Sequence, residues 1–101
     1  MTNLKQKLFQ EGFVTQLNGN QLDFYHNKYR TTIKNPRNIS FETLVALLKT
    51  IRKLDENNIN IIIDDNQSVS IQNKSDNYLT TIDNLQETLV NIYETHIRKE
   101  N

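Results

Sequence analysis

Apolar residues recur with helical spacing between Ile39 and Leu54, and this stretch predicts the central helix of the domain. The apolar positions form one broad stripe on a helix of 3.6 residues per turn: Phe41, Leu44, Leu47, Leu48, Ile51 and Leu54. Ser40 is suited to cap this helix, because its hydroxyl can accept a hydrogen bond from an unpaired amide of the first turn. The pattern therefore indicates an amphipathic helix that packs its stripe against the rest of the chain.

A shorter helix is expected before it, over Thr2–Gln10, with Thr2 as its cap and Gly12 as its stop. Its inward residues are expected to be Leu4, Leu8 and Phe9. Three strands should follow, because apolar and polar positions alternate: Phe13–Leu17, Gln21–Asn27 and Tyr29–Ile33. Asn18-Gly19 predicts a hairpin between the first two strands, since this dipeptide tolerates the positive φ angles of a type I′ turn.

Alternation also assigns faces to these strands. The inward side chains are expected to be Phe13, Thr15, Leu17, Leu22, Phe24, His26, Tyr29, Thr31 and Ile33. The outward side chains include Asp23, Tyr25, Lys28, Arg30, Thr32 and Lys34. Asn35-Pro36 ends the third strand, because proline donates no hydrogen bond to a strand ladder.

The second half of the chain predicts a hairpin and a helix. The near-continuous isoleucine of Ile59–Ile63 is typical of an interior strand, and Ser68–Gln72 returns beside it. Lys74–Asn77 is predicted to be a loop. The final helix is expected from about Thr80 or Asp83 to Lys99, and its inward stripe comprises Ile82, Leu85, Leu89, Ile92, Tyr93, His96 and Ile97.

These elements predict a single α+β domain over residues 1–101. We expect an antiparallel sheet of four to five strands with two amphipathic helices on one face, in the order α-β-β-(β)-α-β-β-α. Glu42-Thr43-Leu44-Val45 recurs as Glu87-Thr88-Leu89-Val90, which is compatible with a tandem duplication of a ββα unit over residues 12–56 and 58–99. Chance similarity is the alternative, because the chain is rich in Asn and Thr.

The composition constrains origin and compartment more than chemistry. The chain holds fifteen Asn, two Gly, one Pro and no Cys. Such a bias is typical of an AT-rich coding sequence, as in a low-GC bacterium or its mobile elements. Without cysteine there is no disulfide framework and no thiolate metal site. No apolar run resembles a signal peptide or a membrane span, so we expect a cytoplasmic protein with no membrane partner.

The charge is zero overall but unevenly distributed. Residues 1–58 carry nine Lys and Arg against five Asp and Glu, and residues 59–101 carry three against seven. A neutral chain has no general attraction to nucleic acid, so any such binding would have to be local to the basic half.

Candidate chemistry is sparse. His26 and His96 fall on inward stripes, and packed histidines are favoured over acid-base residues. Asp64-Asp65-Asn66-Gln67-Ser68 begins like a calcium loop but lacks its glycine and its bidentate glutamate, so a β-turn is favoured. The motifs of phosphate loops, catalytic triads and zinc sites are missing from the sequence. We therefore expect no enzyme, no cofactor and no metal site.

One basic cluster remains as a candidate partner-binding site: Tyr25, Lys28, Arg30, Lys34 and Arg37. An aromatic residue beside cations on an open sheet is found in proteins that bind single-stranded nucleic acid. The alternative is that the third strand lies at a sheet edge and its charges prevent edge-to-edge aggregation.

Two functions stay open at this point. The first is a small protein-binding module, a stoichiometric inhibitor of anti-defence type, encoded by a phage or plasmid and directed at a host macromolecular machine that could itself be a nucleoprotein complex. The second is direct nucleic-acid binding through the basic outer edge of the first half. A homodimer that completes its sheet across an edge strand is compatible with either function.

Overall fold

The computed structural model describes residues 3–54, 59–73 and 76–100, with side chains placed up to Ile92. The elements follow one another as α1 (Leu4–Gln10), β1 (Val14–Asn18), β2 (Gln21–His26), β3 (Tyr29–Lys34), the 3-10 helix η1 (Pro36–Asn38), α2 (Phe41–Leu54), β4 (Asn60–Ile63), β5 (Ser68–Asn73), β6 (Asp76–Thr81) and α3 (Leu85–Glu100).

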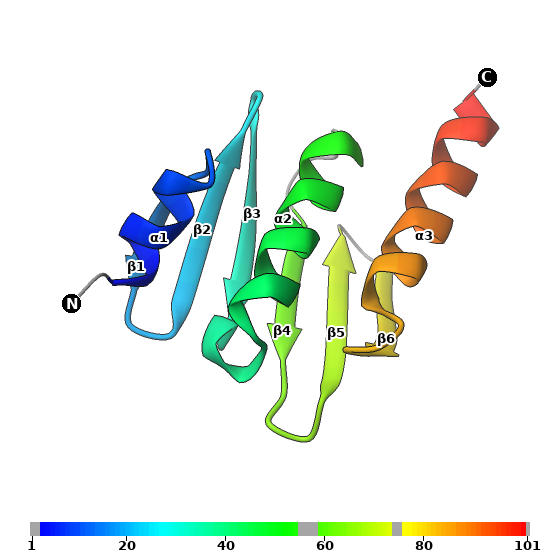
Figure 1. The fold of residues 1–101 in the computed structure, drawn as a ribbon. Coiled ribbons are helices and arrows are strands. Elements are labelled where there is room, and N and C mark those ends of the chain that lie inside the picture. Colours follow the sequence, from blue (N-terminus) through cyan, green and yellow to red (C-terminus); the bar gives the residue numbers. More distant parts are fainter. Residues whose placement is uncertain (1–2, 55–58, 74–75, 101) are drawn as a thin grey trace.

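The strands form one six-stranded sheet in which the spatial order follows the chain, from β1 at one edge to β6 at the other. All neighbours are antiparallel except β3 and β4, which are parallel. The reason is α2, which runs back along the sheet between these two strands, so that β4 starts at the end where β3 started (Figure 1). The α+β class is confirmed. The expected sheet of four to five antiparallel strands was wrong in the number of strands and in the direction of one pair, β3 and β4.

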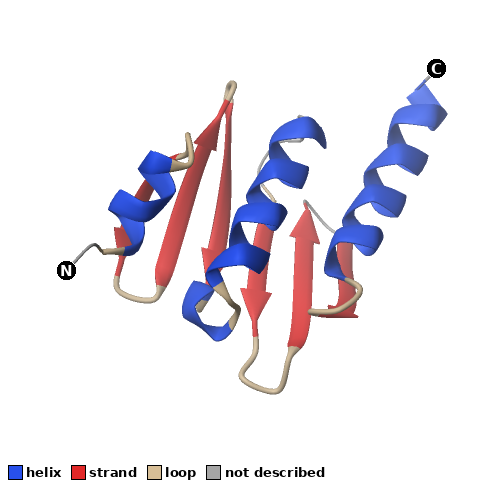
Figure 2. Cartoon of the chain, in the orientation of Figure 1, coloured by secondary structure: helices blue, strands red, loops and turns tan. Residues whose placement is uncertain are grey.

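The helices all lie on one face of the sheet (Figure 2). α1 packs on β1, α3 contacts β6, and α2 lies over the middle of the sheet and contacts α3. The opposite side, called the open face below, is not covered by any element in the described ranges. The fold therefore has two layers, with helices on one side and an uncovered sheet surface on the other.

The core fills the space between the two layers. It includes the α2 residues Leu44, Leu47, Leu48 and Ile51, the strand residues Leu22, Phe24, Ile33, Ile61, Ile63, Val69 and Ile71, and Phe13 and Ile59, which directly precede β1 and β4. The predicted cap of α2 is confirmed, because the amide of Thr43 donates to Ser40 Oγ over 3.1 Å. The predicted faces of the first three strands are confirmed as well, since their inward residues are buried or half-buried.

The first helix differs from the expectation in its cap residue and in one of its inward residues. Thr2 lies outside the described residues, and the cap is Asn3, whose side chain accepts from the amide of Gln6 over 2.8 Å. Leu8 is buried, but Phe9, expected to face inward, is 71% exposed. With only seven residues, α1 has room for a narrow buried stripe, and Phe9 lies beside it.

The sixth strand was missed. Residues 76–81 were divided between a loop and the start of the last helix, whereas Asp76–Thr81 pairs with β5 along its whole length. The strand has no clear apolar alternation, because apolar Leu79 lies on its exposed side and polar Thr80 on its half-buried side. The last helix begins at Leu85, and the predicted inward residues Tyr93, His96 and Ile97 lie beyond the described side chains.

The β1–β2 hairpin has the predicted place but a different turn. Its two central residues are Gly19 and Asn20, between the paired residues Asn18 and Gln21. Gly19 has a φ of +60°, and Asn20 has no positive φ. A glycine at the first central position is typical of type II′ and not of the expected type I′.

The two halves of the chain share one order of elements. Each consists of three antiparallel strands followed by a helix, β1-β2-β3-α2 and then β4-β5-β6-α3. The unit is thus βββα rather than the expected ββα. A tandem duplication stays a prediction.

Candidate functional site

Three of the predicted binding residues lie together on the open face. Tyr25 in β2 and Arg30 in β3 are direct cross-strand partners, and Lys34 faces the same way from the end of β3. All three side chains are exposed. Strand geometry places Arg30 and Lys34 about 13 Å apart along β3, since each residue advances about 3.3 Å.

The other two residues lie elsewhere. Lys28 is an exposed residue of the turn between β2 and β3. Arg37 belongs to η1 and lines a groove on the helix-covered side. The direction of the chain changes at Asn35, which has a φ of +61°, so strand alternation does not extend to Arg37. The five residues do not form one surface.

The cations of β3 do not protect a sheet edge. β3 pairs with β2 on one side and with β4 on the other, so it is an interior strand. The edge-protection alternative considered above is therefore wrong for Arg30 and Lys34. Their charges instead point away from the helices, over the middle of the open face.

A row of polar residues crosses the open face beside these cations. In register from β1 to β6, this polar row consists of Gln16, Asp23, Thr32, Asn60, Gln72 and Asn77. Asp23 was expected to be exposed but is only 6% exposed, because its neighbours cover it. Its Oδ1 accepts from Thr32 Oγ1 over 3.1 Å and from Gln21 Nε2 over 3.2 Å.

Next to the polar row the open face is hollowed. This central hollow has a volume of about 250 Å³ and is lined by Gln21, Thr32, Lys34, Asn60, Ile61, Ile62 and Gln72. Asp23 bonds two of these residues, Gln21 and Thr32, and so holds their side chains in place. The hollow offers an ammonium group and side-chain amides, which suit hydrogen bonding to carboxylates and peptide groups.

Aromatic residues are scarce on this surface. Among the described strand residues that face away from the helices, Tyr25 is the single aromatic one. A platform for stacking successive bases needs several aromatic side chains. The open face therefore resembles a polar docking surface more than a base-stacking surface.

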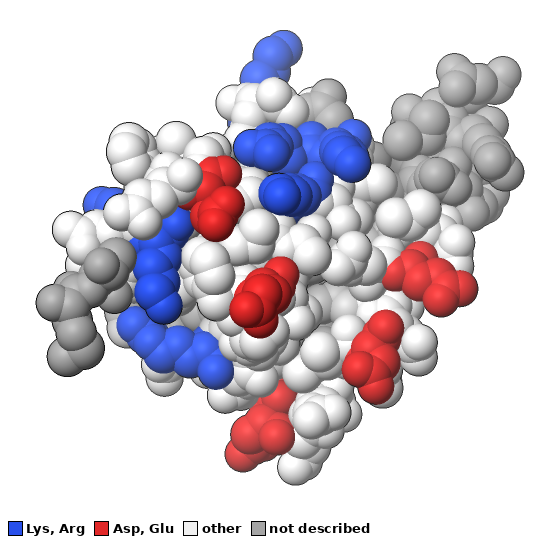
Figure 3. All heavy atoms as spheres, viewed as in Figure 1, with Lys and Arg blue, Asp and Glu red and all other residues white. Residues whose placement is uncertain are grey.

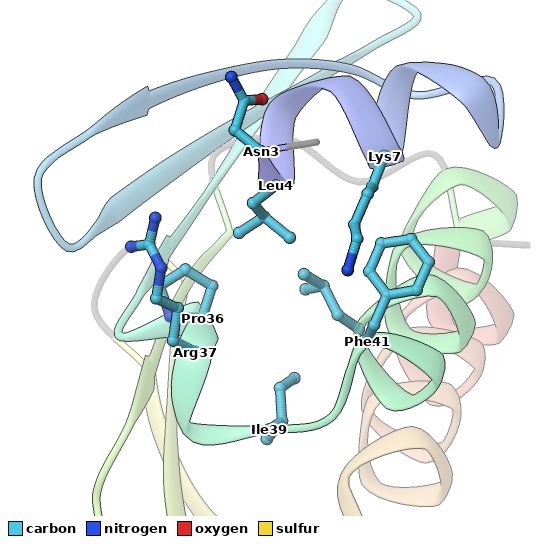
Figure 4. A pocket seen from close by; sticks show the side chains of 8 residues that line it. Asn3, Leu4, Lys7, Pro36, Arg37, Ile39 and Phe41 are labelled. Atoms are coloured by element: carbon cyan, nitrogen blue, oxygen red, sulfur yellow. The ribbon is translucent and has the colours of Figure 1, made fainter. Parts of the chain in front are cut away.

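A second concave region lies on the helix-covered side, between α1, η1 and the start of α2 (Figure 4). It has a volume of about 390 Å³ and is lined by Asn3, Leu4, Lys7, Pro36, Arg37, Ile39, Phe41 and Leu44. Lys7 Nζ lies 5.2 Å from the centre of the Phe41 ring. Arg37 stands on the other side of the groove, with Leu4 between the two cations in the view. The ring already binds Lys7 through a cation–π contact.

The helix-covered side carries charged groups of both signs. Figure 3 shows Lys and Arg over the left and the top of this side, and Asp and Glu over its middle and its right.

The buried histidine has a structural role. His26 is 5% exposed, its Nε2 lies 2.9 Å from Thr31 Oγ1, and its ring stacks on Phe24 with centres 4.7 Å apart. The interpretation as a packed histidine is confirmed for His26. His96 lies beyond the described side chains.

The acidic segment after β4 is a turn, as predicted. Asp64 Oδ1 accepts from the amide of Asn66 over 3.2 Å, and Gln67 has a φ of +67°. A hydrogen bond from the Asp65 side chain lowers the pKa of Asp64, and the same bond and the charge of Asp64 raise the pKa of Asp65. Within the described residues no three His, Cys, Asp or Glu side chains gather as metal ligands.

A comparison of the chain with protein-family models, with curated proteins and with solved structures finds no match. Every helix in the described part of the chain is too short or too polar to cross a membrane.

Proposed function

We propose that this chain is a non-catalytic protein-binding module that docks on a partner protein through its open face, with Tyr25, Arg30 and Lys34 as first contacts. The proposal includes its biological role: a stoichiometric inhibitor of anti-defence type, encoded by a phage or plasmid, that acts on a host macromolecular machine in the cytoplasm. The abundance of Asn, Ile and Lys supports an origin in an AT-rich mobile element.

The uncovered face of the sheet is the observation that carries this proposal. All the described helices lie on one side, and the other side presents the polar row and two outward cations on an interior strand. Charges at that position do not serve to block an edge. Antiparallel sheets commonly leave one face to water, but an exposed Tyr beside an exposed Arg is also what protein interfaces favour.

The side chains of the open face indicate which groups a partner should present. Arg30 and Lys34 can form ion pairs with acidic groups, and the amides of the polar row can form hydrogen bonds with peptide groups or polar side chains. Tyr25 offers a rigid aromatic contact, of the kind that often contributes most to binding energy. The expected partner is a protein with an acidic, polar patch about as wide as the sheet.

Direct nucleic-acid binding has less support. Arg37 lies on the helix-covered side, apart from Arg30 and Lys34, and Tyr25 has no second outward aromatic beside it among the described strand residues. If nucleic acid were the target, binding through about four cations would give a slope of about −3 to −4 for log K against log salt concentration.

Capture from a host lysate tests the proposal. The full chain, immobilised, should retain one stoichiometric protein at ordinary salt, and nuclease treatment should leave that capture unchanged. Arg30→Glu should reduce the retained amount about tenfold, since reversing a charge at an interface costs roughly 1.4 kcal/mol or more. Lys53→Glu is the matched control, because Lys53 is an exposed cation of α2 on the helix-covered side.

Retention of no protein, or retention that nuclease abolishes, would contradict protein binding. Equal loss with Arg30→Glu and Lys53→Glu would show that overall charge, and not the open face, governs capture.

A further inference from the structure

The edge of β1 gathers exposed apolar side chains. Of the four large apolar side chains that the described chain exposes, three surround one place: Phe9 at 71%, Val14 at 60% and Tyr25 at 43% exposure. They line a hollow of about 280 Å³, called the edge hollow, together with Lys5, Phe13, Thr15 and Gln16. Apolar side chains gathered around a hollow, in contrast to single exposed ones, mark an interaction site.

The same edge has free backbone groups. β1 is the first strand of the sheet and pairs only with β2 among the described strands. The two-residue turn makes Asn18–Gln21 a hydrogen-bonded pair, and such pairs alternate along an antiparallel ladder. Consequently the N–H and C=O groups of Thr15 and Leu17 point away from β2. They can pair with a further strand.

Nothing in β1 itself blocks such pairing. Natural proteins protect edge strands with charges, prolines or bulges. The sequence of β1, Val-Thr-Gln-Leu-Asn, contains no charged residue and no proline, and it pairs with β2 without interruption.

Thr15 adds a polar group that has no partner within the described chain. Its side chain is 5% exposed, and its Oγ1 makes no hydrogen bond. A strand added beside β1 would bring a side chain of its own next to Thr15. Cross-strand Thr–Thr and Thr–Ser pairs form hydrogen bonds of the kind that this hydroxyl lacks.

The edge hollow adjoins the open face. Val14, Tyr25 and Arg30 are neighbours across three strands, so the edge hollow continues the open face at the β1 edge.

We propose that the β1 edge accepts an extended segment of the partner protein as a seventh strand of the sheet, with a large apolar residue in the edge hollow and an acidic residue near Lys5. This inference rests on the proposed protein-binding function and specifies how the partner is held. Main-chain hydrogen bonds to Thr15 and Leu17 give affinity, and the hollow gives specificity.

Charge complementarity favours a foreign segment over a second copy of this chain. Lys5 is the charged residue among those that line the edge hollow. The β1 strand of a second copy, Val14–Asn18, would offer Lys5 no acidic side chain of its own. A segment with an acidic residue can form an ion pair with this ammonium group.

A library of short random peptides displayed on phage, selected on the full chain, tests this inference. Enriched peptides should alternate apolar and polar residues and carry Asp or Glu. A synthetic copy should bind Phe9→Glu about tenfold more weakly or worse, because the hollow loses its aromatic wall and gains a repelling charge. Gln86→Glu is the matched control, since it adds the same charge at an exposed position of α3, on the helix-covered side and away from β1.

Amide hydrogen exchange supplies the readout specific to strand addition. The amides of Thr15 and Leu17 should exchange fast in the free chain and slowly with the peptide bound, while the amide of Leu79 should not change. The inference is overturned if no peptide is enriched, if both variants bind equally, or if Thr15 and Leu17 stay fast in the complex. It is also overturned if these amides are already protected in a dimer that Phe9→Glu dissociates.

The two proposals fail in different ways. If a captured host protein is lost with Arg30→Glu but kept with Phe9→Glu, docking through the open face is supported and strand addition at the β1 edge is contradicted. If a peptide binds at the β1 edge but no host protein is captured, strand addition is supported and docking of a host protein through the open face is contradicted.

Discussion

Two buried threonines of this domain differ in the state of their hydroxyl groups. Thr31 is fully buried and its Oγ1 lies 2.9 Å from His26 Nε2. Thr15 is almost as deeply buried, and its Oγ1 has no partner within the described chain. Since a buried polar group without a hydrogen bond costs free energy, the two residues should respond in opposite ways to the loss of the hydroxyl.

We predict that Thr15→Val raises the free energy of unfolding by about 1 kcal/mol and that Thr31→Val lowers it by about 1 to 3 kcal/mol. The first substitution removes an unsatisfied group, and the second leaves a ring nitrogen of His26 without its bond to Thr31. Urea denaturation of both variants measures the difference. Destabilisation by Thr15→Val would show that its hydroxyl is satisfied in solution.

For single residues, the sequence predicts the direction of a side chain better than it predicts how deeply that side chain is buried. Tyr25, Arg30 and Lys34 face outward as alternation predicts, because a strand fixes this for every residue within it. Asp23 also faces outward, yet it is buried by hydrogen-bonded neighbours on adjacent strands. Pattern along one strand carries no information about those neighbours.

The short helix η1 links elements that are far apart in sequence. Asn35 Nδ2 and Asn38 Nδ2 both donate to the carbonyl oxygen of Ile63, over 3.1 Å and 3.0 Å. These bonds join the end of β3 to the end of β4, next to the single parallel pair of the sheet. Asn35 has a left-handed backbone, with φ +61° and ψ +51°, which asparagine tolerates better than most residues.

We predict that Asn35→Ala lowers the free energy of unfolding by about 2 kcal/mol and Asn38→Ala by about 1 kcal/mol. Both variants lose one hydrogen bond to Ile63, but only Asn35→Ala also places an alanine in the left-handed region. Asn35→Gly separates the two effects, because glycine accepts that backbone. Thermal unfolding of the three variants would contradict this account if Asn38→Ala were the most damaging.

At the scale of elements, the sequence predicts the long periodic segments and fails at short ones. α2 has a full apolar stripe and a serine cap, so its limits could be predicted. β6 was hidden because Thr80-Thr81 also suits the start of a helix, and its pairing with β5 is a tertiary contact. The parallel contact of β3 and β4 depends on the path of α2, which no local pattern shows.

For the whole molecule, the central prediction was that the helices share one side and leave the other side of the sheet uncovered. The described elements have this arrangement, with three helices rather than two (Figure 2). It could be predicted because apolar alternation places one face of every strand in the core. The position of Arg37 in a separate groove could not, because it depends on the turn at η1.

Lysine acetylation of the complex with the captured partner tests the docking surface most directly. Lys34 faces outward from the sheet, whereas Lys49 and Lys53 are exposed on α2, on the opposite side of the molecule. In the free chain all three should react with acetic anhydride, as mass spectrometry of the digested protein would show. With the partner bound, we predict that Lys34 becomes protected while Lys49 and Lys53 react as before. Protection of Lys49 and Lys53 with Lys34 still reactive would place the partner on the helices and contradict the account.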